Sequence, residues 1–195
     1  TGDGFKFAEK VGHTITDLSP SLVPLYVSEA YIKELMGLSL KNISITIRSG
    51  QKEIYKDFGE LLFTHFGVSG PVILSASSHI IPYINNKDRI TLSIDLKPAL
   101  SYQQLDARIL KDFDKNKNRQ FKNSLSQLLP NKLIDVIIPL SYINPDKQVN
   151  SITKEERLKL VELLKNLTFN IIRLAPYNQA VITKGGINTK EINPS

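Results

Sequence analysis

The sequence predicts an α+β protein in which an antiparallel β-sheet or small β-barrel carries a nested helical-bundle insertion. Residues 38–47 and 89–96 alternate apolar and polar side chains, as half-buried strands do. After Pro98 the apolar residues recur at helical spacing instead. Strand-like sequence returns in 169–174 and 179–183, so the first strands are completed only by residues that follow the helices.

Four strands are expected before the helices. Besides 38–47 and 89–96, they cover 53–56 and 59–64. Gly50 marks the turn after the first of them. Their alternating pattern is typical of strands with one face on a core and the other in solvent.

The helical insertion is expected to contain four helices. The first two follow Pro98 with core positions four residues apart: Leu105, Ile109 and Phe113, then Phe121, Leu125 and Leu129. A third covers 132–138. The fourth begins with a capping box, in which the Thr153 hydroxyl and the Glu156 carboxylate satisfy each other's free amides.

The composition excludes several classes of protein and site. Cysteine is absent, which excludes disulfides, thiolate zinc sites and electron transfer through a cysteine pair. No histidine has the neighbours of a metal site. Every apolar run is far shorter than the roughly 18 residues of a membrane span, and no secretory signal opens the chain. We therefore expect a cytoplasmic protein without membrane contact.

The net charge of +6 raises the question of a nucleic-acid partner. The lysines are spread along the chain, and much of the basic excess lies in one helical stretch, which argues against that partner. One alternative stays open, in which the insertion docks an acidic partner or RNA without a role in catalysis. Its basic residues are Lys111, Lys115, Lys117, Arg119 and Lys122.

The chain opens on Thr1-Gly-Asp-Gly4, followed by a helix expected over 3–11 that ends at Gly12. A helix N-terminus exposes free amide groups at its positive end, and small residues let a phosphate, sugar or carbonyl approach. The plainer interpretation is that Thr1 or Asp3 caps the helix while the glycines form a turn.

The segment Phe63-Thr-His-Phe-Gly-Val-Ser-Gly-Pro71 ends a strand and begins a helix. Its glycines permit tight turns, and Pro71 suits the first position of a helix that runs to about Ser78. His65 is a candidate general base or carbonyl-polarising group. A lone histidine without a visible carboxylate partner is more often structural.

The segment Thr183-Lys-Gly-Gly-Ile187 places paired glycines directly after an apolar strand. This arrangement suits a backbone that passes close to a flat ligand, and it equally suits a hairpin turn. No dinucleotide fingerprint, phosphate-binding loop or nucleophile elbow occurs in the sequence. A complete nucleotide-dependent enzyme is therefore not present in these residues.

These motifs, in this order, resemble a family of bacterial flavoproteins called aminoacetone oxidase-like proteins or NAD(FAD)-utilising dehydrogenases, the HI0933-like proteins. The resemblance is specific over about 1–27, 59–75 and 179–195, and Lys184 departs from the small residue expected there. The matching segments are Thr1-Gly-Asp-Gly-Phe5, Gly12-His13, Pro20-Ser-Leu-Val-Pro24, Gly59-Glu-Leu-Leu-Phe-Thr-His-Phe-Gly-Val-Ser-Gly-Pro71, Ala180-Val-Ile-Thr-Lys-Gly-Gly-Ile187 and Glu191-Ile-Asn-Pro194.

The resemblance implies that the chain is an internal piece of a larger FAD-dependent oxidoreductase. The single methionine, Met36, and the abrupt end agree with that expectation. Residues 1–18 would form the edge of the parent FAD-binding domain, and 185–195 the return towards it. Residues 19–100 and 168–184 would form the inserted β-rich domain, and 101–167 its helical insertion.

The resemblance also implies what this piece does. It would cover the flavin and shape substrate access, and would be inactive alone. Its expected partners are the parent FAD-binding domain and a small-molecule substrate, with NAD(P)H as reductant. The residues expected on the cofactor side are Thr1, Gly2, Asp3, Gly4, Thr183, Gly185 and Gly186. Those expected on the substrate side are Thr64, His65 and Ser69, with His65 the candidate for catalysis.

Overall fold

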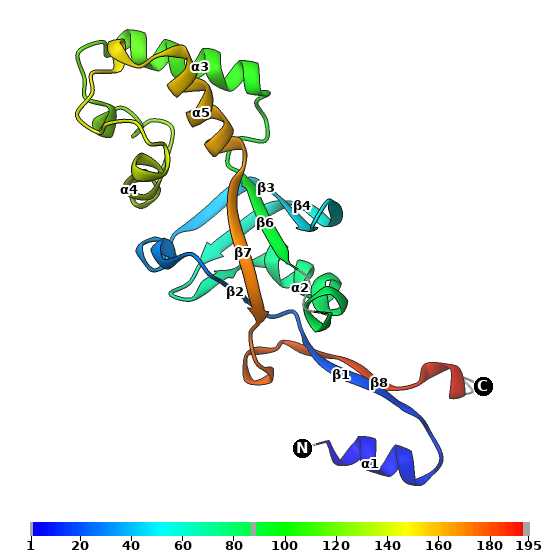
Figure 1. The fold of residues 1–195 in the computed structure, drawn as a ribbon. Coiled ribbons are helices and arrows are strands. Elements are labelled where there is room, and N and C mark those ends of the chain that lie inside the picture. The colour runs from blue at the N-terminus through cyan, green and yellow to red at the C-terminus, as the bar shows by residue number, and fades with distance from the viewer. Residues whose placement is uncertain (1, 87–88, 193–195) are drawn as a thin grey trace.

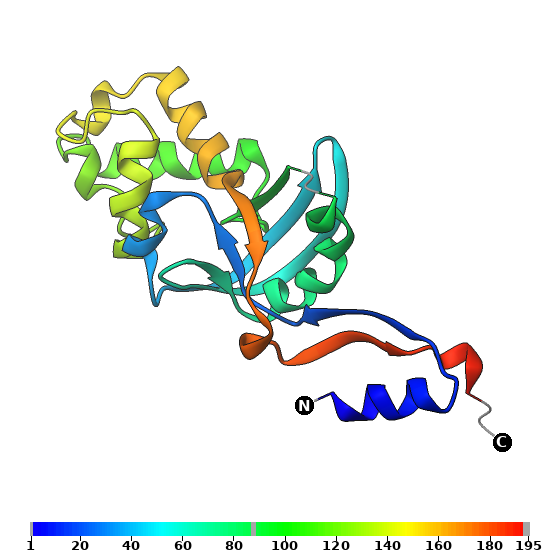
Figure 2. The ribbon, with the colours of Figure 1, turned by 60° about the horizontal axis from the view of Figure 1, so that its bottom comes forward.

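The computed structural model describes residues 2–86 and 89–192, which form three parts along one long axis (Figure 1). At one end lies the stalk, by which we mean α1 (Asp3–Lys10), β1 (Ile15–Ser21) and β8 (Ile182–Ile187). A β-barrel occupies the middle and a helical block the other end. The first and the last described residues, Gly2 and Ile192, both belong to the stalk end of the molecule, far from the helical block (Figure 2).

The β-barrel is closed, with the strand order β2–β5–β4–β3–β6–β7. All of its neighbouring strands are antiparallel, and β2 closes it by pairing with both β5 and β7. The predicted α+β class with a small barrel is therefore confirmed. The strands are β2 (Leu25–Val27), β3 (Ser39–Ser49), β4 (Lys52–Phe63), β5 (Gly67–Ser69), β6 (Ile90–Asp95) and β7 (Leu167–Leu174).

One strand replaces the two that were predicted over 53–56 and 59–64, because β4 runs through both. Gly59 does not interrupt β4 but pairs with Ile43 of β3. Its missing side chain leaves room for the helix behind the strand, since a Cβ at Gly59 would lie 2.7 Å from Val72 Cγ1. The glycine reflects close packing within the strand and does not mark a turn.

The stalk strands were predicted poorly. β1 was not expected at all, because only Ser21 of Ile15–Ser21 is buried and the strand shows no alternation. Its Pro20 is tolerated because the two-stranded sheet has only edge strands. The last strand was placed at 179–183, but β8 begins at Ile182, after a 3₁₀ turn over Tyr177–Gln179.

The longer helices outside the stalk are α2 (Pro71–Asn85), α3 (Tyr102–Lys115), α4 (Asn131–Leu140) and α5 (Lys154–Lys165). α2 starts at Pro71 as predicted but continues well beyond Ser78. The capping box of α5 is confirmed, and a second one, Ser101 with Gln104, begins α3. Short 3₁₀ helices cover Ala30–Leu35, Phe121–Asn123, Val149–Ser151, Tyr177–Gln179 and Thr189–Glu191.

The second helix predicted in the insertion, around Phe121 to Leu129, is wrong. Its backbone forms a short 3₁₀ helix and turns, because the Phe121 amide donates to the Lys147 carbonyl and the Lys122 amide to that of Pro145. These bonds fasten the segment to a distant loop in place of a helical ladder. The side chains of Phe121, Leu125 and Leu129 are nevertheless buried, so the core pattern was predicted correctly.

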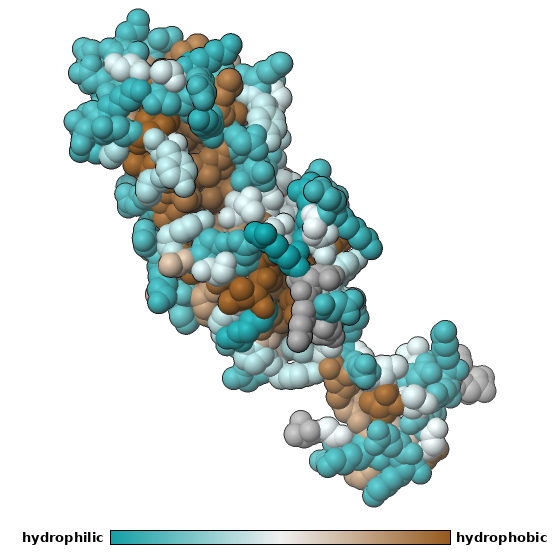
Figure 3. Space-filling view, in the orientation of Figure 1, coloured by the Kyte–Doolittle hydropathy of each residue, from teal (hydrophilic) through white to brown (hydrophobic). Residues whose placement is uncertain are grey.

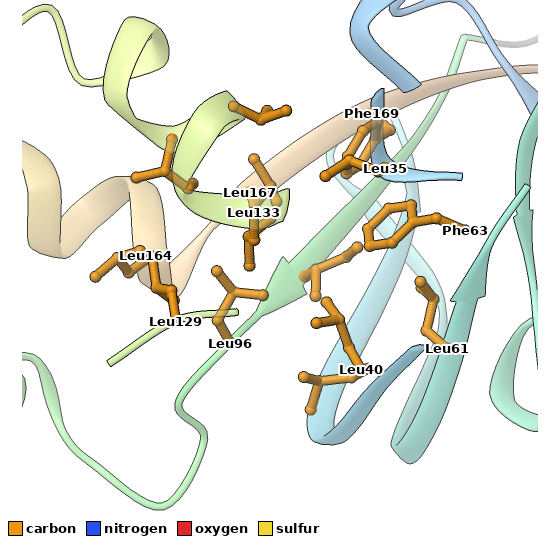
Figure 4. Packing of buried hydrophobic residues seen from close by; sticks show 14 of the residues in the cluster. Leu35, Leu40, Leu61, Phe63, Leu96, Leu129, Leu133, Leu164, Leu167 and Phe169 are labelled. Atoms are coloured by element: carbon orange, nitrogen blue, oxygen red, sulfur yellow. The ribbon is translucent and has the colours of Figure 1, made fainter. Parts of the chain in front are cut away.

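A single hydrophobic core runs from the barrel into the helical block (Figure 4). Phe63 and Phe169 meet inside the barrel with ring centroids 5.9 Å apart. The core continues through Leu96 and Leu167 to Leu133 and the neighbouring side chains of the helical block (Figure 4). The helical block therefore lies against the barrel on shared apolar contacts.

Lys165 reinforces this junction. Its side chain is 8% exposed, and its ammonium lies 2.6 Å from the Asp95 carboxylate at the end of β6. The same ammonium donates hydrogen bonds to the carbonyl oxygens of Lys97 and Leu100. One cation thus joins the last turn of α5 to the loop that leaves the barrel.

Replacing Lys165 by methionine is expected to lower the free energy of unfolding by about 3 kcal/mol, because the Asp95 carboxylate and two carbonyls lose their donor. Denaturant unfolding followed by circular dichroism measures the change. The control is Lys159→Met, which removes an exposed pair with Glu155 and should change stability by at most about 0.5 kcal/mol. Equal effects of the two substitutions would contradict the joining role.

Candidate functional site

The stalk brings the two predicted cofactor-side segments together. β1 and β8 run antiparallel, with Ile15 opposite Ile187 and Ser21 opposite Ile182. The ring of Phe5, on α1, lies beside Gly186 of β8. Segments from opposite ends of the sequence therefore meet in one small structure that projects from the barrel (Figure 2).

The paired glycines lie within β8, so the hairpin-turn interpretation is wrong. Gly185 has φ of +92°, and a Cβ there would lie 2.1 Å from the Asp17 carbonyl oxygen. Gly186 has φ of +128°, and its Cβ would meet the Phe5 ring at 3.2 Å. The register shift between Thr16 and Ser19 of β1 lies opposite them. Contacts within the stalk thus already require glycine at both positions, and a flavin contact there stays a prediction.

The start of α1 is open. Its N-cap is Gly2, with φ of 120° and no side-chain cap, so the predicted capping by Asp3 is wrong. The Asp3 carboxylate instead lies 3.7 Å from the Lys6 ammonium in an exposed pair. A Cβ at Gly2 or Gly4 would meet no atom within 4 Å. Thr1, the other predicted cap and cofactor residue, lies outside the described residues.

The Glu191 carboxylate, after β8, contacts the loop between α1 and β1. Glu191 accepts a hydrogen bond of 2.7 Å from the Thr14 amide, and His13 Nδ1 lies 3.6 Å from the same carboxylate. The donation by Thr14 holds the pKa of Glu191 below its ordinary value. The end of the matched Glu191-Ile-Asn-Pro194 motif falls at residues 193 and 194, outside the described residues.

α2 connects the stalk to the barrel. The Lys184 ammonium, on β8, donates to the Ser78 carbonyl oxygen at 3.1 Å. The Val23 amide, just after β1, donates to the buried Ser77 hydroxyl at 3.1 Å. Thr183, predicted on the cofactor side, pairs with Pro20 and is exposed. The stalk is thus held against the helix that begins at the Ser69-Gly70 turn.

The predicted substrate-side residues lie on the barrel, Thr64 and His65 in the loop between β4 and β5 and Ser69 at the end of β5. The Thr64 hydroxyl accepts hydrogen bonds from the amides of Phe66 and Gly67, so it stabilises the turn. His65 is exposed, and Ser69 pairs with Leu62 in the short ladder of β4 and β5. Within the described part of the chain, His65 forms no ion pair with a carboxylate.

The loop contributes to an aromatic stack that the sequence did not reveal. The rings of Phe66 and Tyr26 are stacked, with centroids 4.1 Å apart and an interplanar angle of 18°. The Arg173 guanidinium carbon lies 3.5 Å from the centroid of Tyr26. His65 meets Phe66 edge-on, with centroids 4.9 Å apart. Tyr26 and Arg173 carried no signal in the sequence, because only the register of β2 with its neighbours brings them together.

The helical block carries an open hollow of about 540 Å³ beside the N-terminus of α4. A second hollow of about 430 Å³ adjoins it, since Arg119 lines both. Lys122 faces the first, and its ammonium lies 2.6 Å from Asp146. Lys115 and Lys117 line the second and form no ion pair within residues 2–86 and 89–192. This surface is the basic one that the sequence indicated.

Two properties are absent from the described residues. Across residues 2–86 and 89–192, no three histidine or carboxylate side chains are grouped so that they could hold a metal ion. Over the same residues, no helix has both the length and the apolar character that crossing a membrane requires.

Three curated relatives match nearly the whole chain. A 3-dehydro-bile acid delta(4,6)-reductase of Clostridium scindens is 23% identical over 193 residues, which are 99% of this chain and 47% of the relative. Ribosomal RNA dihydrouridine synthases of Escherichia coli and Haemophilus influenzae are 26% and 30% identical, each over 97% of this chain and 44% of the relative. The chain thus spans about half the length of the curated relatives it matches.

A family model describes the same region. The model of the HI0933-like protein barrel and H2TH domain matches residues 19–182, from the middle of β1 to the start of β8. Its barrel corresponds to the closed six-stranded barrel observed here. The chain therefore belongs to the family of HI0933-like proteins that carry this barrel and H2TH domain.

Proposed function

We propose that this chain is the substrate and cap module of an FAD-dependent oxidoreductase, and that it is inactive without the rest of the protein. The stalk would join it to the FAD-binding domain, and the barrel would cover the flavin. The names of the relatives, a reductase and dihydrouridine synthases, favour a reduction as the reaction. NAD(P)H is the proposed source of the electrons.

The observation that carries this proposal is the unpartnered apolar surface of the stalk. Phe7 and Ile182 of the stalk are 63% and 49% exposed, and Val11 and Val181, which directly follow α1 and precede β8, are 76% and 67% exposed. In α1 the only buried residue is Ala8. Apolar surface also lies open on the stalk in the space-filling view (Figure 3). Such a surface is typical of an interaction site, and a neighbouring domain of the same polypeptide fits it.

The residues at the start of α1 fit a flavin dinucleotide. The helix has no side-chain cap, and the space beside Gly2 and Gly4 is open, so a phosphate or carbonyl could reach the free amides. The Cβ positions of Gly185 and Gly186, in contrast, already face the protein itself. We therefore propose that the start of α1 contacts the cofactor. The paired glycines instead allow β8 to pack closely against β1 and α1.

FAD, when bound, would supply hydride transfer, and the chain's own residues would position and shield the reaction. α2 holds the stalk against the barrel through Ser77 and Ser78, which fixes the barrel relative to the cofactor side. The barrel wall would keep water from the reacting atoms. His65 is exposed on the proposed substrate side and could donate or accept a proton there.

Expression of the full-length protein and of this chain alone tests the proposal. The full-length protein should be yellow, with flavin absorbance in the visible range, and should oxidise NAD(P)H. This chain alone should be colourless and inactive, because it carries only the edge of the flavin site. A full-length protein that stays colourless after addition of FAD would overturn the proposal.

A second candidate is favoured by the basic surface of the helical block. Within the part of the chain that the structure describes, Lys115 and Lys117 form no ion pair, and Arg119 lines both hollows of this surface. Two relatives are named for ribosomal RNA. In this alternative the block docks RNA and has no role in catalysis. Affinity of the full-length protein for RNA that survives moderate salt supports it, and rapid loss of affinity with salt indicates non-specific attraction only.

A further inference from the structure

A hollow of about 270 Å³, which we call the junction hollow, lies where the barrel meets the helical block. Much of its lining is apolar and comes from both parts: Leu40 and Ile43 of β3, Leu96 after β6, and Leu129 and Leu133 of the helical block. In Figure 4 the Leu96 side chain lies between Leu40 and Leu129. All five side chains belong to the shared core, so the junction hollow opens onto that core.

Two lysines line the same hollow, and they differ in their partners. The Lys41 ammonium lies 3.7 Å from the Glu60 carboxylate. Lys97 is half-buried, and within the described part of the chain its ammonium forms neither an ion pair nor a hydrogen bond. Burial, together with the nearby Arg108 guanidinium, lowers the pKa of Lys97 from its ordinary value. A negative group bound beside Lys97 would counter both effects.

The carboxylates around the junction hollow are already paired with other cations. These pairs are Glu60 with Lys41, Asp112 with Arg108 at 2.9 Å, and Asp95 with Lys165 at 2.6 Å. The Asp95 carboxylate receives only the backbone amide of Lys97. α4 begins at the hollow, at Pro130, without a side-chain cap, and the start of a helix favours a negative charge. The charge of the Lys97 ammonium is therefore left unmatched beside an apolar lining.

We propose that the junction hollow binds a monocarboxylate with a short, straight apolar chain, with the carboxylate at Lys97 and the chain against the leucines. Its volume lies below the roughly 300–1,000 Å³ of pockets for drug-sized ligands, so a straight chain fits it better than fused rings. The ligand would contact the barrel and the helical block together. The site goes beyond the proposed function, because it lies away from the stalk and needs no flavin (Figure 1).

The test uses the full-length protein and sodium octanoate, with binding measured by isothermal titration calorimetry. Each methylene added between hexanoate and octanoate should tighten binding about fourfold, the gain that burial of one methylene gives. Octanol keeps the chain but lacks the charge, and should bind roughly 10- to 150-fold more weakly than octanoate, the range for a hydrogen bond to a charged group. Octanol that binds as tightly as octanoate would overturn the inference.

Substitution of Lys97 locates the bound carboxylate. Lys97→Met keeps a long apolar side chain but loses the charge, so it should weaken octanoate roughly 10- to 150-fold and leave octanol unchanged. Lys97→Arg should keep most of the affinity, because it keeps the charge. The matched control is Lys56→Met, which removes an exposed barrel lysine that lines a different hollow and should bind like wild type. Unchanged binding in Lys97→Met, or an equal loss in the control, would overturn the inference.

Photocrosslinking keeps the test independent of variants that fold poorly. A straight-chain carboxylate that carries a diazirine on its chain, irradiated with the unmutated full-length protein, should crosslink to peptides that contain Leu40, Leu96 or Leu129. An excess of octanoate should suppress these crosslinks. Crosslinks confined to other parts of the protein, such as the stalk or the loop of His65, would overturn the inference. Flavin absorbance is recorded in parallel, so a colourless protein with crosslinks at the junction hollow would contradict only the proposed function.

Discussion

Replacement of Gly67 by alanine is expected to open the barrel and to lower the free energy of unfolding by about 3 kcal/mol or more. The added Cβ would lie 2.0 Å from the Leu25 carbonyl oxygen and 3.0 Å from Tyr26 Cα. Both contacts are with backbone, so no side-chain rotation can relieve them. The strands must therefore separate, and β2 would lose its pairing with β5. The barrel is closed only because β2 pairs with both β5 and β7.

Alanine substitutions at two other glycines, Gly59 and Gly4, separate the effect of this backbone clash from a general effect of replacing glycine. At Gly59 the added Cβ meets the end of the Val72 side chain at 2.7 Å, so a rotamer change can absorb part of the cost and the loss should be smaller. At Gly4 nothing lies within 4 Å, and alanine should be neutral or slightly stabilising in a helix. Denaturant unfolding of the full-length protein after removal of its flavin should rank the variants in that order, since without the cofactor Gly4→Ala reports on the helix alone. A Gly67→Ala protein as stable as Gly4→Ala would contradict the proposed closure.

The barrel was predictable from the sequence because its long strands are half-buried. Ile43, Ile45 and Ile47 of β3 are buried and alternate with polar residues, and this pattern depends only on local spacing. The cap of α5 was predictable for the same reason, since the capping box of Thr153 and Glu156 is complete within four residues. Closure of the sheet could not be deduced, because β2 and β5 are too short to show a period.

The stalk and the aromatic stack of Tyr26 and Phe66 were less predictable for a different reason. β1 packs on too little to bury alternate residues, so its sequence has no strand pattern. Gly185 was singled out correctly as unusual, but its cause, the Asp17 carbonyl, lies far away in sequence. Arg173 and Tyr26 are likewise joined only through strand register. The sequence pointed to the loop that contains His65. The structure was needed to find that Tyr26 and Arg173 lie beside it.

Replacement of Gly185 by alanine is expected to remove flavin from the full-length protein while leaving the barrel folded. Gly185 has φ of +92°, and its Cβ would overlap the Asp17 carbonyl oxygen at 2.1 Å, so β1 and β8 must part. The barrel core contains no stalk residue, and its unfolding transition should therefore shift little. Visible absorbance of the purified protein should fall to a small fraction of the wild-type value.

Gly50→Ala is the matched control for backbone strain. Gly50 also has positive φ, at +55°, but a Cβ there would meet no atom within 4 Å, and it lies in the β3–β4 hairpin away from the stalk. It should cost about 1 kcal/mol of stability through the left-handed conformation and keep its flavin. If Gly185→Ala retains flavin as Gly50→Ala does, the pairing of β1 with β8 is not what joins this module to the cofactor domain. If both variants lose it, the loss follows from general destabilisation, and the stalk has no special part in holding the cofactor.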